Sequence, residues 1–333
     1  MTARSGQQAK LQFILYAVCS LVFALCESAQ AQQPKVHRVG IITAGGGWYE
    51  MIDGLRVGLR ELGLEEGKQF VLAIRETKGT AKAAEEAARN LELEKANLIY
   101  TTQTSVTLAA KRATTDISVV FCAGADPVVA GLVTSFAKPG GRLTGVFYRD
   151  SDLTAKRLAI LKEIVSKLHR VVTFYNPNNP VARESAKLVR EETARMRGIE
   201  LVEKHVASIE ELQASLRALK IGDVDAIFEV SDALVAIEDQ LIIDAARGKK
   251  LATIFINQAS VTKGGLATYS INRREVGRVS ARYVQRILAG VNPQELPVQG
   301  VDKIELILNL KTAKEIGLTI PPNVLARADK VIK

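Results

Sequence analysis

The chain has 333 residues, of which 47 % are hydrophobic and 24 % are charged, and its formal net charge is +9. This length is enough for two domains of ordinary size. The basic residues are spread among acidic ones along helical segments and are not clustered with aromatic residues, so the composition argues against a nucleic-acid-binding protein.

The first 31 residues have the pattern of a secretory signal peptide. Arg4 and Lys10 give a basic start, an apolar run covers residues 11–25, and small residues precede a cleavage site after Ala31. The run is shorter than the roughly 20 residues of a membrane span. Cys26 follows a leucine rather than a small residue, which argues against lipid attachment. We therefore expect cleavage near Ala31 and an exported, soluble mature protein.

Cleavage there would also remove Cys19 and Cys26 and leave Cys122 as the last cysteine of the mature chain. A single cysteine cannot form an intrachain disulfide. Cys122 lies at the end of an apolar strand pattern, where a buried and unreactive thiol is the usual case. We expect the stability of the protein to come from its hydrophobic core.

Residues 36–122 alternate between strand and helix patterns. Each apolar run of strand length is followed by a segment in which apolar residues recur at helical spacing. This alternation predicts an α/β fold with a parallel sheet and right-handed crossovers. The expected strands cover residues 36–43, 70–74, 97–101 and 118–122, and the expected helices cover residues 52–62 and 80–93.

The turn after the third strand is the first candidate for a ligand site. Thr102, Gln103, Thr104 and Ser105 stand between an apolar strand and a helix that begins near residue 106. In a parallel sheet such a turn lies at the carboxyl end of a strand, where ligands bind and where the following helix dipole favours an anion. The hydroxyls suit a carboxylate. Alternatively, Thr104 or Ser105 only caps the helix.

A second turn of this kind follows residue 122. Ala125 and Asp126 precede Pro127, which fits the first turn of a helix. Asp126 is expected to cap that helix, and it could in addition receive the ammonium group of a ligand. The sequence KPGG at residues 138–141 then breaks the pattern, and we expect the chain to pass to a second lobe there.

The same alternation resumes from residue 153. It predicts a second lobe of the same Rossmann-like kind, with a ligand site between the two lobes and a hinge motion that closes it. Expected strands cover residues 170–175, 199–206, 224–230, 251–256 and 266–270, and expected helices cover residues 153–166, 180–197, 233–247 and 276–288.

Turns at the strand ends of both lobes supply the remaining candidates. Trp48, the only tryptophan, could stack on an aromatic or apolar ligand, or it could lie on the surface or pack between the lobes. The full set of expected ligand-binding residues is Thr43, Trp48, Tyr49, Thr102, Gln103, Thr104, Ser105, Ala125, Asp126, Tyr148, Asn176, Asn178, Ser231, Asp232, Asn257 and Tyr269.

Several motifs, in matching order along the chain, resemble those of the ABC transporter substrate-binding protein family, whose better-known relatives bind tryptophan and related amino acids. They are RVGI at 38–41, GLRVGLRELG at 54–63, ADPV at 125–128, KPGGRLTG at 138–145, NPNNP at 176–180, ELILNLKTAK at 305–314, GLTIPP at 317–322 and LARAD at 325–329. The run of three glycines followed by Trp48 and Tyr49 departs from that pattern, which leaves the ligand open between an amino acid and an aromatic or aliphatic organic acid.

The resemblance implies a type I periplasmic-binding-protein fold with three crossings between lobes, near residues 142–147, 269–273 and 300–305. It assigns residues 32–143 and 272–301 to the N-terminal lobe and residues 144–271 and 302–333 to the C-terminal lobe. It further implies a periplasmic, monomeric protein that captures a small carboxylate and delivers it to an ABC permease in the inner membrane. A ligand-sensing receptor component is an alternative that the sequence does not separate from transport.

An exported α/β enzyme that uses the same cleft is the third alternative. The residues argue against it, because the single Cys122 excludes a two-cysteine racemase, and no phosphate loop with a lysine or Gly-x-Ser-x-Gly turn is present. His37, His169 and His205 lie far apart in the sequence without the spacing of a zinc site. We therefore expect no catalytic residue, no metal and no cofactor.

Overall fold

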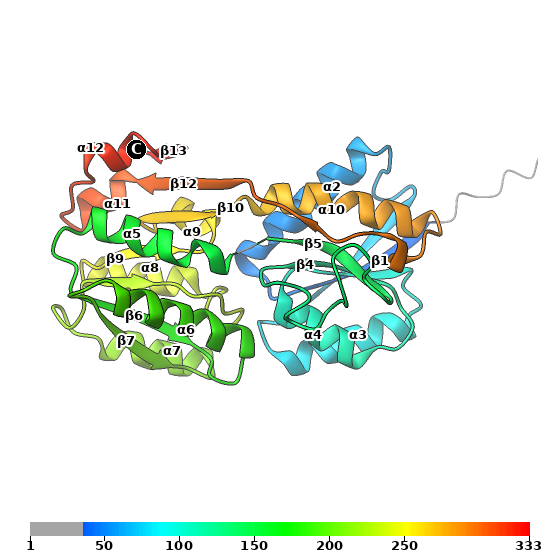
Figure 1. Ribbon diagram of the computed structural model, residues 1–333, viewed down its shortest axis with the longest axis horizontal. Coiled ribbons are helices and arrows are strands. Elements are labelled where there is room, and N and C mark those ends of the chain that lie inside the picture. Colours follow the sequence, from blue (N-terminus) through cyan, green and yellow to red (C-terminus); the bar gives the residue numbers. More distant parts are fainter. Residues whose placement is uncertain (1–35, 149) are drawn as a thin grey trace, which may run out of the picture. The chain divides into compact units, whose positions relative to one another are not determined.

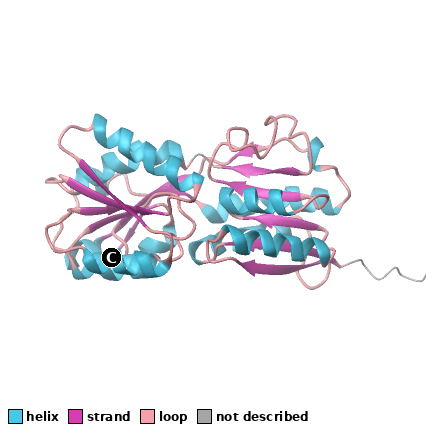
Figure 2. Ribbon diagram, turned by 90° about the horizontal axis from the view of Figure 1, so that it is seen from below, coloured by secondary structure: helices cyan, strands magenta, loops and turns pink. Residues whose placement is uncertain are grey.

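The computed structural model describes residues 36–148 and 150–333, so the expected signal peptide lies outside the described residues. Its strands form two sheets, here called sheet A and sheet B. Both are α/β structures with helices on each face, as the sequence predicts (Figures 1 and 2). Among the described helices none is long and apolar enough to cross a membrane.

Sheet A has six strands, all paired in parallel, in the order β11-β5-β4-β3-β1-β2. Parallel strands that are separated by helical crossovers are buried on both faces and read as apolar runs. Its strands are β1 (His37–Thr43), β2 (Phe70–Glu76), β3 (Leu98–Thr101), β4 (Val119–Ala123), β5 (Leu143–Phe147) and β11 (Gln299–Gly300).

Helices cover both faces of sheet A. Successive residues of a strand point to opposite faces, and in β4 Val120 packs into the core under α2 and α10 whereas Phe121 packs into the core under α3 and α4. The helices are α2 (Tyr49–Glu61), α3 (Ala81–Leu93), α4 (Thr104–Ala113) and α10 (Arg273–Leu288), with short 3₁₀ helices η1 (Gly46–Trp48) and η3 (Pro293–Glu295).

Sheet B has seven strands in the order β13-β12-β10-β9-β8-β6-β7. All neighbours are parallel except β10 and β12, which are antiparallel. The chain enters β12 directly from β11 of sheet A and not through a helical crossover, which explains the reversed direction. The strands are β6 (Arg170–Tyr175), β7 (Glu200–His205), β8 (Ala226–Phe228), β9 (Ala252–Phe255), β10 (Ala267–Ile271), β12 (Ile304–Asn309) and β13 (Lys330–Ile332).

Two cores lie on the opposite faces of sheet B, under α5 and α6 on one face and under α7 and α8 on the other. The helices of this half are α5 (Thr154–Ile164), α6 (Pro180–Arg195), α7 (Ile209–Ala218), α8 (Asp239–Gly248), α9 (Gln258–Thr262), α11 (Leu310–Glu315) and α12 (Pro322–Leu325), with the 3₁₀ helix η2 (Ser151–Leu153) before α5.

Two local predictions are wrong. The helix expected after Asp126 is absent, because residues 127–131 form turns and residues 132–134 are irregular. The strand expected at residues 224–230 shrinks to the three residues of β8, and the segment that follows it is a turn up to Asp239, where α8 begins. In both places the apolar residues pack into a core without regular backbone pairing.

The chain passes between the sheets three times: after β5, between β10 and α10, and between β11 and β12. The passage between β10 and α10 is the shortest, with Asn272 as its single residue and as the N-cap of α10. Helix α10 then packs along α2, on the face of sheet A.

Candidate functional site

The turns after β1 and β3 meet at one edge of sheet A, because the two strands are parallel neighbours. The Thr102 hydroxyl donates to the Thr43 hydroxyl at 3.0 Å. Thr43 also accepts from the Gly45 backbone N–H at 3.2 Å. Both threonine side chains are fully buried, so their hydroxyls connect the two turns inside the protein.

Gln103 connects the same turns to the tryptophan. With its amide oriented so that the oxygen faces donors, the oxygen accepts from the Trp48 indole N–H at 2.9 Å and from the Ala44 N–H at 3.2 Å. The amide nitrogen then donates to Thr102 at 2.7 Å. Trp48 is only 3 % exposed, so its indole N–H is both buried and satisfied.

Thr104 joins the turn after β3 to the turn after β4. Its hydroxyl accepts from the backbone N–H groups of Gly124 at 3.0 Å and of Ala125 at 3.2 Å. Helix α4 begins at Thr104 with Gln103 as N-cap, and the side chain of Gln103 does not bond the first-turn N–H groups. The alternative that Thr104 or Ser105 caps the helix is therefore wrong, and the first turn of α4 can serve an anionic ligand.

Asp126 caps a turn and not a helix. Its Oδ1 accepts from the N–H groups of Val128 at 2.8 Å and of Val129 at 3.1 Å. Within the described part of the chain its Oδ2 has no hydrogen-bond donor, and the side chain is half-buried. One carboxylate oxygen is thus used by the fold while the other can receive a ligand.

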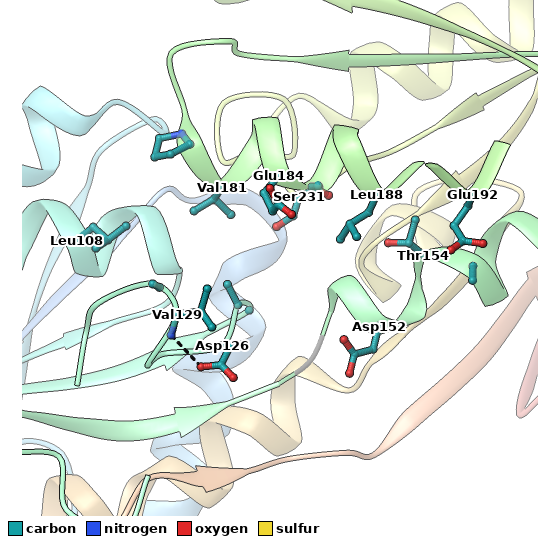
Figure 3. A pocket seen from close by; sticks show the side chains of 16 residues that line it. Leu108, Asp126, Val129, Asp152, Thr154, Val181, Glu184, Leu188, Glu192 and Ser231 are labelled. Carbon is teal, nitrogen blue, oxygen red and sulfur yellow. Dashed lines mark hydrogen bonds between the residues drawn. The ribbon is translucent and has the colours of Figure 1, made fainter. Parts of the chain in front are cut away.

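A cavity of about 710 Å³ lies beside these turns. Leu108, Val129 and Asp126 form one wall and Val181, Glu184 and Leu188 form the other (Figure 3). The first wall comes from α4 and the turn after β4, and the second from helix α6. Its lining is Leu108, Gly124, Ala125, Asp126, Val129, Ala130, Asp152, Thr154, Ala155, Pro180, Val181, Glu184, Ser185, Leu188, Glu192 and Ser231.

A smaller and more polar cavity of about 10 Å³, room for one water molecule, adjoins the large one. The two cavities share Gly124, Val181 and Ser231. The rest of the small lining is Trp48, Gln103, Thr104, Ser105, Tyr148, Asn179 and Ala233. The combined space therefore has a polar end at the start of α4 and a wider, mainly apolar end between α4 and α6.

The charged side chains that line the large cavity are all negative among the residues that the structure describes. Asp126, Asp152, Glu184 and Glu192 line it, and no lysine or arginine does so among the residues described. Glu184 pairs with Lys187 at 3.3 Å and Glu192 pairs with Arg195, both one turn along the helix. Among the described residues an anion therefore finds no cationic side chain in the cavity, and the donors that they offer are N–H and hydroxyl groups.

The face of α6 was not predicted from the sequence. Asn179 caps the helix through the Val181 N–H at 3.1 Å, and Pro180 occupies the first turn. Val181, Glu184 and Leu188 then follow at helical spacing on the side that lines the cavity. The Ser185 hydroxyl accepts from the Ser231 N–H at 3.0 Å and fixes the turn after β8 against α6.

The expected ligand residues fall into three groups by position. Trp48, Gln103, Thr104, Ser105, Ala125, Asp126, Tyr148 and Ser231 line the two adjoining cavities. Asn176 and Asn178 line a third cavity of about 470 Å³ beside α4, which shares Leu108 and Pro180 with the large cavity and Ser105 and Asn179 with the small one. The cavities described here leave out Thr43, Tyr49, Thr102, Asp232, Asn257 and Tyr269.

The residues of the third group make contacts within the protein. The Tyr49 hydroxyl donates to Glu76 at 2.8 Å. Asp232 accepts from three backbone N–H groups, including that of Asn176 at 2.8 Å. Asn257 caps α9, and the backbone oxygen of Tyr269 accepts from Arg157 at 2.8 Å. Each of these groups stabilises a turn or helix start near the site.

Cys122 is fully buried and bonds the Tyr100 hydroxyl at 2.9 Å. Burial raises the pKa of its thiol to about 12. The thiolate is the reactive form of cysteine, so a thiol with so high a pKa is inert near neutral pH. The expectation that this cysteine is buried is confirmed.

Comparisons of the sequence and of the fold with known proteins identify the family of the chain. The chain is 26 % identical over 266 residues to a tyrosine-binding protein of Clostridioides difficile strain R20291, covering 80 % of this chain and 76 % of that protein. A conserved domain protein of Vibrio cholerae has a similar structure, with a TM-score of 0.81 and 28 % identity, covering 89 % of this chain and 100 % of the other. An ABC domain from Streptococcus pneumoniae, solved with L-Trp, shares the fold at a TM-score of 0.80 and 22 % identity, covering 90 % and 100 %. The family described as ABC transporter substrate binding protein matches residues 38–332, and the chain belongs to that family.

Proposed function

We propose that the protein binds one zwitterionic amino acid with an apolar or aromatic side chain and delivers it, unchanged, to an ABC permease. The observation that carries this proposal is the division of the cavity into a polar end and an apolar end. Export to the periplasm, a monomeric state and the absence of nucleic acid binding remain predictions of the sequence. Sensing on behalf of a membrane receptor would use the same site.

The donors of the polar end suit a ligand carboxylate that lies at the border between this water-sized space and the wide end. The first turn of α4 offers backbone N–H groups and the positive end of the helix dipole. Ser105 and Ser231 add hydroxyls there. Because no cationic side chain lines the cavity in the described residues, a dianion would be poorly held, whereas a single carboxylate matches these donors.

The carboxylates of the wall favour an ammonium group over an electrically neutral substituent. Asp126 stands at the border of the polar end and has one free oxygen. A plain organic acid would bring a second negative charge close to the carboxylate of Asp126, and like charges at close range repel. The preference for an ammonium group narrows the proposed ligand class from small carboxylates in general to amino acids.

The apolar end has room for a large side chain. A cavity of about 710 Å³ lies within the usual range for small-molecule sites. Leu108, Val129, Val181 and Leu188 offer aliphatic surface to a ring or branched chain. The relative in Clostridioides difficile is named for tyrosine, which fits such a space.

The test is a ligand panel in which one charge is removed at a time. L-tyrosine, L-tryptophan and L-leucine should raise the melting temperature, because a ligand at 100 times its Kd stabilises a protein by about 2.7 kcal/mol. Indole-3-propionate lacks the ammonium of tryptophan and tryptamine lacks its carboxylate, so both should bind at least tenfold more weakly by calorimetry. Equal binding of indole-3-propionate and L-tryptophan would assign the site to organic acids.

Asp126→Asn tests the ammonium contact. The amide oxygen can still accept from the N–H groups of Val128 and Val129, so we expect the melting temperature of the free protein to stay within a few degrees. A hydrogen bond to a charged group contributes about 1.5–3 kcal/mol, so the Kd for an amino acid should rise roughly 10- to 100-fold. Glu200→Asn, on the exposed end of β7, is the matched control and should leave the Kd unchanged.

We further propose that sheets A and B with their helices form two lobes that close on the ligand. The sequence places their boundaries at residues 143–144, 271–272 and 301–302. Pairing of β5 with β4 supports moving the first boundary to residue 147. Three short connecting segments are the arrangement in which hinge closure occurs.

A further inference from the structure

A buried charged cluster lies behind the tryptophan of the site. Arg273, Glu229 and Asp239 are 2 %, 3 % and 1 % exposed. Arg273 is the first residue of α10, directly after the passage between β10 and α10. Glu229 follows β8, and Asp239 is the first residue of α8. A cation and two carboxylates are costly to bury, so their retention in the core calls for a structural or functional reason.

Arg273 covers the face of Trp48. Its Cζ lies 3.6 Å from the centroid of the indole ring, a close cation-π contact. The indole N–H on the edge of the same ring donates to Gln103 at 2.9 Å. Trp48 and Gln103 both line the polar cavity. The guanidinium therefore contacts one side of a ring whose other contacts reach the ligand space.

The hydrogen bonds of the cluster are incomplete. Among the described residues Arg273 Nη1, Glu229 Oε1 and Asp239 Oδ1 have no hydrogen-bond partner. Arg273 Nη2 donates to the Ile256 backbone oxygen at 3.4 Å, and the Ile256 N–H donates to Glu229 at 2.8 Å. The other oxygen of Asp239 accepts from the Asn257 amide at 3.2 Å and from the Ser260 hydroxyl. Unpaired buried polar atoms are rare in proteins, so this cluster is not optimised for stability alone.

We propose that Arg273 is a positioning residue for ligand binding: it fixes the Trp48 indole, and through it the Gln103 amide, at the polar end of the cavity, while Glu229 supports the guanidinium through the backbone of Ile256. The proposal rests on the proposed function, because it takes the polar cavity as the ligand site. It also gives Trp48 a role that needs no stacking on the ligand.

The electrostatics of the cluster agree with this assignment. Burial raises the pKa of both Glu229 and Asp239, and the positive charge of Arg273 opposes that rise. Arg157 also acts on Glu229, and Lys263 acts on Asp239, in the same direction as Arg273. Loss of Arg273 would remove this opposing effect and raise the pKa of both carboxyls further.

The first experiment uses the fluorescence of Trp48 in the protein without ligand. Trp48 is the single tryptophan, so the emission of the protein excited at the tryptophan band reports on its surroundings alone. Arg273→Lys keeps the charge but removes the planar face, and we expect a shifted emission maximum and at least twofold stronger quenching by acrylamide. Arg274→Lys changes the neighbouring exposed arginine and should alter neither.

The second experiment measures binding of L-tyrosine by calorimetry. Arg273→Lys and Trp48→Phe should each raise the Kd about tenfold, and the double variant should bind within twofold of Trp48→Phe, because both changes break the same chain of contacts. Should Arg273→Lys not fold, Glu229→Gln replaces it, with a smaller shift in emission and a smaller rise in Kd expected.

The two proposals fail in different ways. Unchanged emission in both Arg273→Lys and Glu229→Gln, or Kd effects that multiply in the double variant, would overturn the role of Arg273. Absence of binding by the unmodified protein to every amino acid of the panel would instead overturn the proposed function, and the emission comparison, which needs no ligand, would still decide whether Arg273 positions Trp48.

Discussion

Gly277→Ala should destabilise the protein by at least about 3 kcal/mol, the upper end of the range for overpacking a core. A Cβ at Gly277 would lie 1.9 Å from the Met51 backbone oxygen of α2. No side-chain rotamer can relieve a clash with backbone, so the two helices must separate. The expected fall in melting temperature is roughly 6–12 °C, measured by differential scanning calorimetry.

The reason lies in how closely α2 and α10 approach. A Cβ at Gly54 would lie 1.9 Å from the Arg274 oxygen, and one at Gly58 would lie 2.4 Å from the Arg278 oxygen. These glycines allow the two backbones to touch, so Gly54→Ala should be as harmful as Gly277→Ala. Gly248→Ala is the matched control, because this helical glycine has open space around its Cβ position and alanine favours the helix. Equal stability of Gly277→Ala and Gly248→Ala would contradict the close crossing.

The sequence was sufficient for the architecture because strand and helix periods are local. The apolar runs that became β1, β3, β4 and β6 were predicted within a few residues, since buried parallel strands need continuous apolar residues. The turn after Asp126 was not predicted, because an Asp-Pro pair can begin either a helix or a turn. The direction of β12 depends on where the chain comes from in space, which its own residues do not encode.

The candidate site was predictable on one wall only. Polar turns at strand ends pointed to Thr104, Ser105 and Asp126, because the carboxyl edge of a parallel sheet gathers them. The wall from α6 was not predicted, because its sequence has the pattern of an ordinary surface helix. Glu184, for example, is exposed. The environment of Trp48 could not be predicted from the sequence either. Arg273, which covers its ring, is remote in the sequence and reaches Trp48 only because α10 packs on α2.

The second large effect is expected at Arg157, on the first turn of α5. Its guanidinium pairs with Asp150 and donates to the Tyr269 backbone oxygen at 2.8 Å. The side chains of Arg157 and Asp150 are 2 % and 8 % exposed, so this ion pair is buried. Asp150 lies in the passage after β5 and Tyr269 lies on β10, close to the next passage. Arg157 therefore ties together two of the segments that connect the sheets.

Arg157→Met should cost about 3–5 kcal/mol of unfolding free energy in urea titrations, because it leaves the Asp150 carboxylate buried without its cation. Arg327→Met removes the exposed pair with Glu163 and should cost no more than about 1 kcal/mol, which makes it the matched control. Adding Asp150→Asn to Arg157→Met should recover at least about 1 kcal/mol, because the unpaired charge is then gone. If the double variant were no more stable than Arg157→Met, the loss would have to come from the freed Tyr269 oxygen and from packing, and the buried charge pair would not be what stabilises these connecting segments.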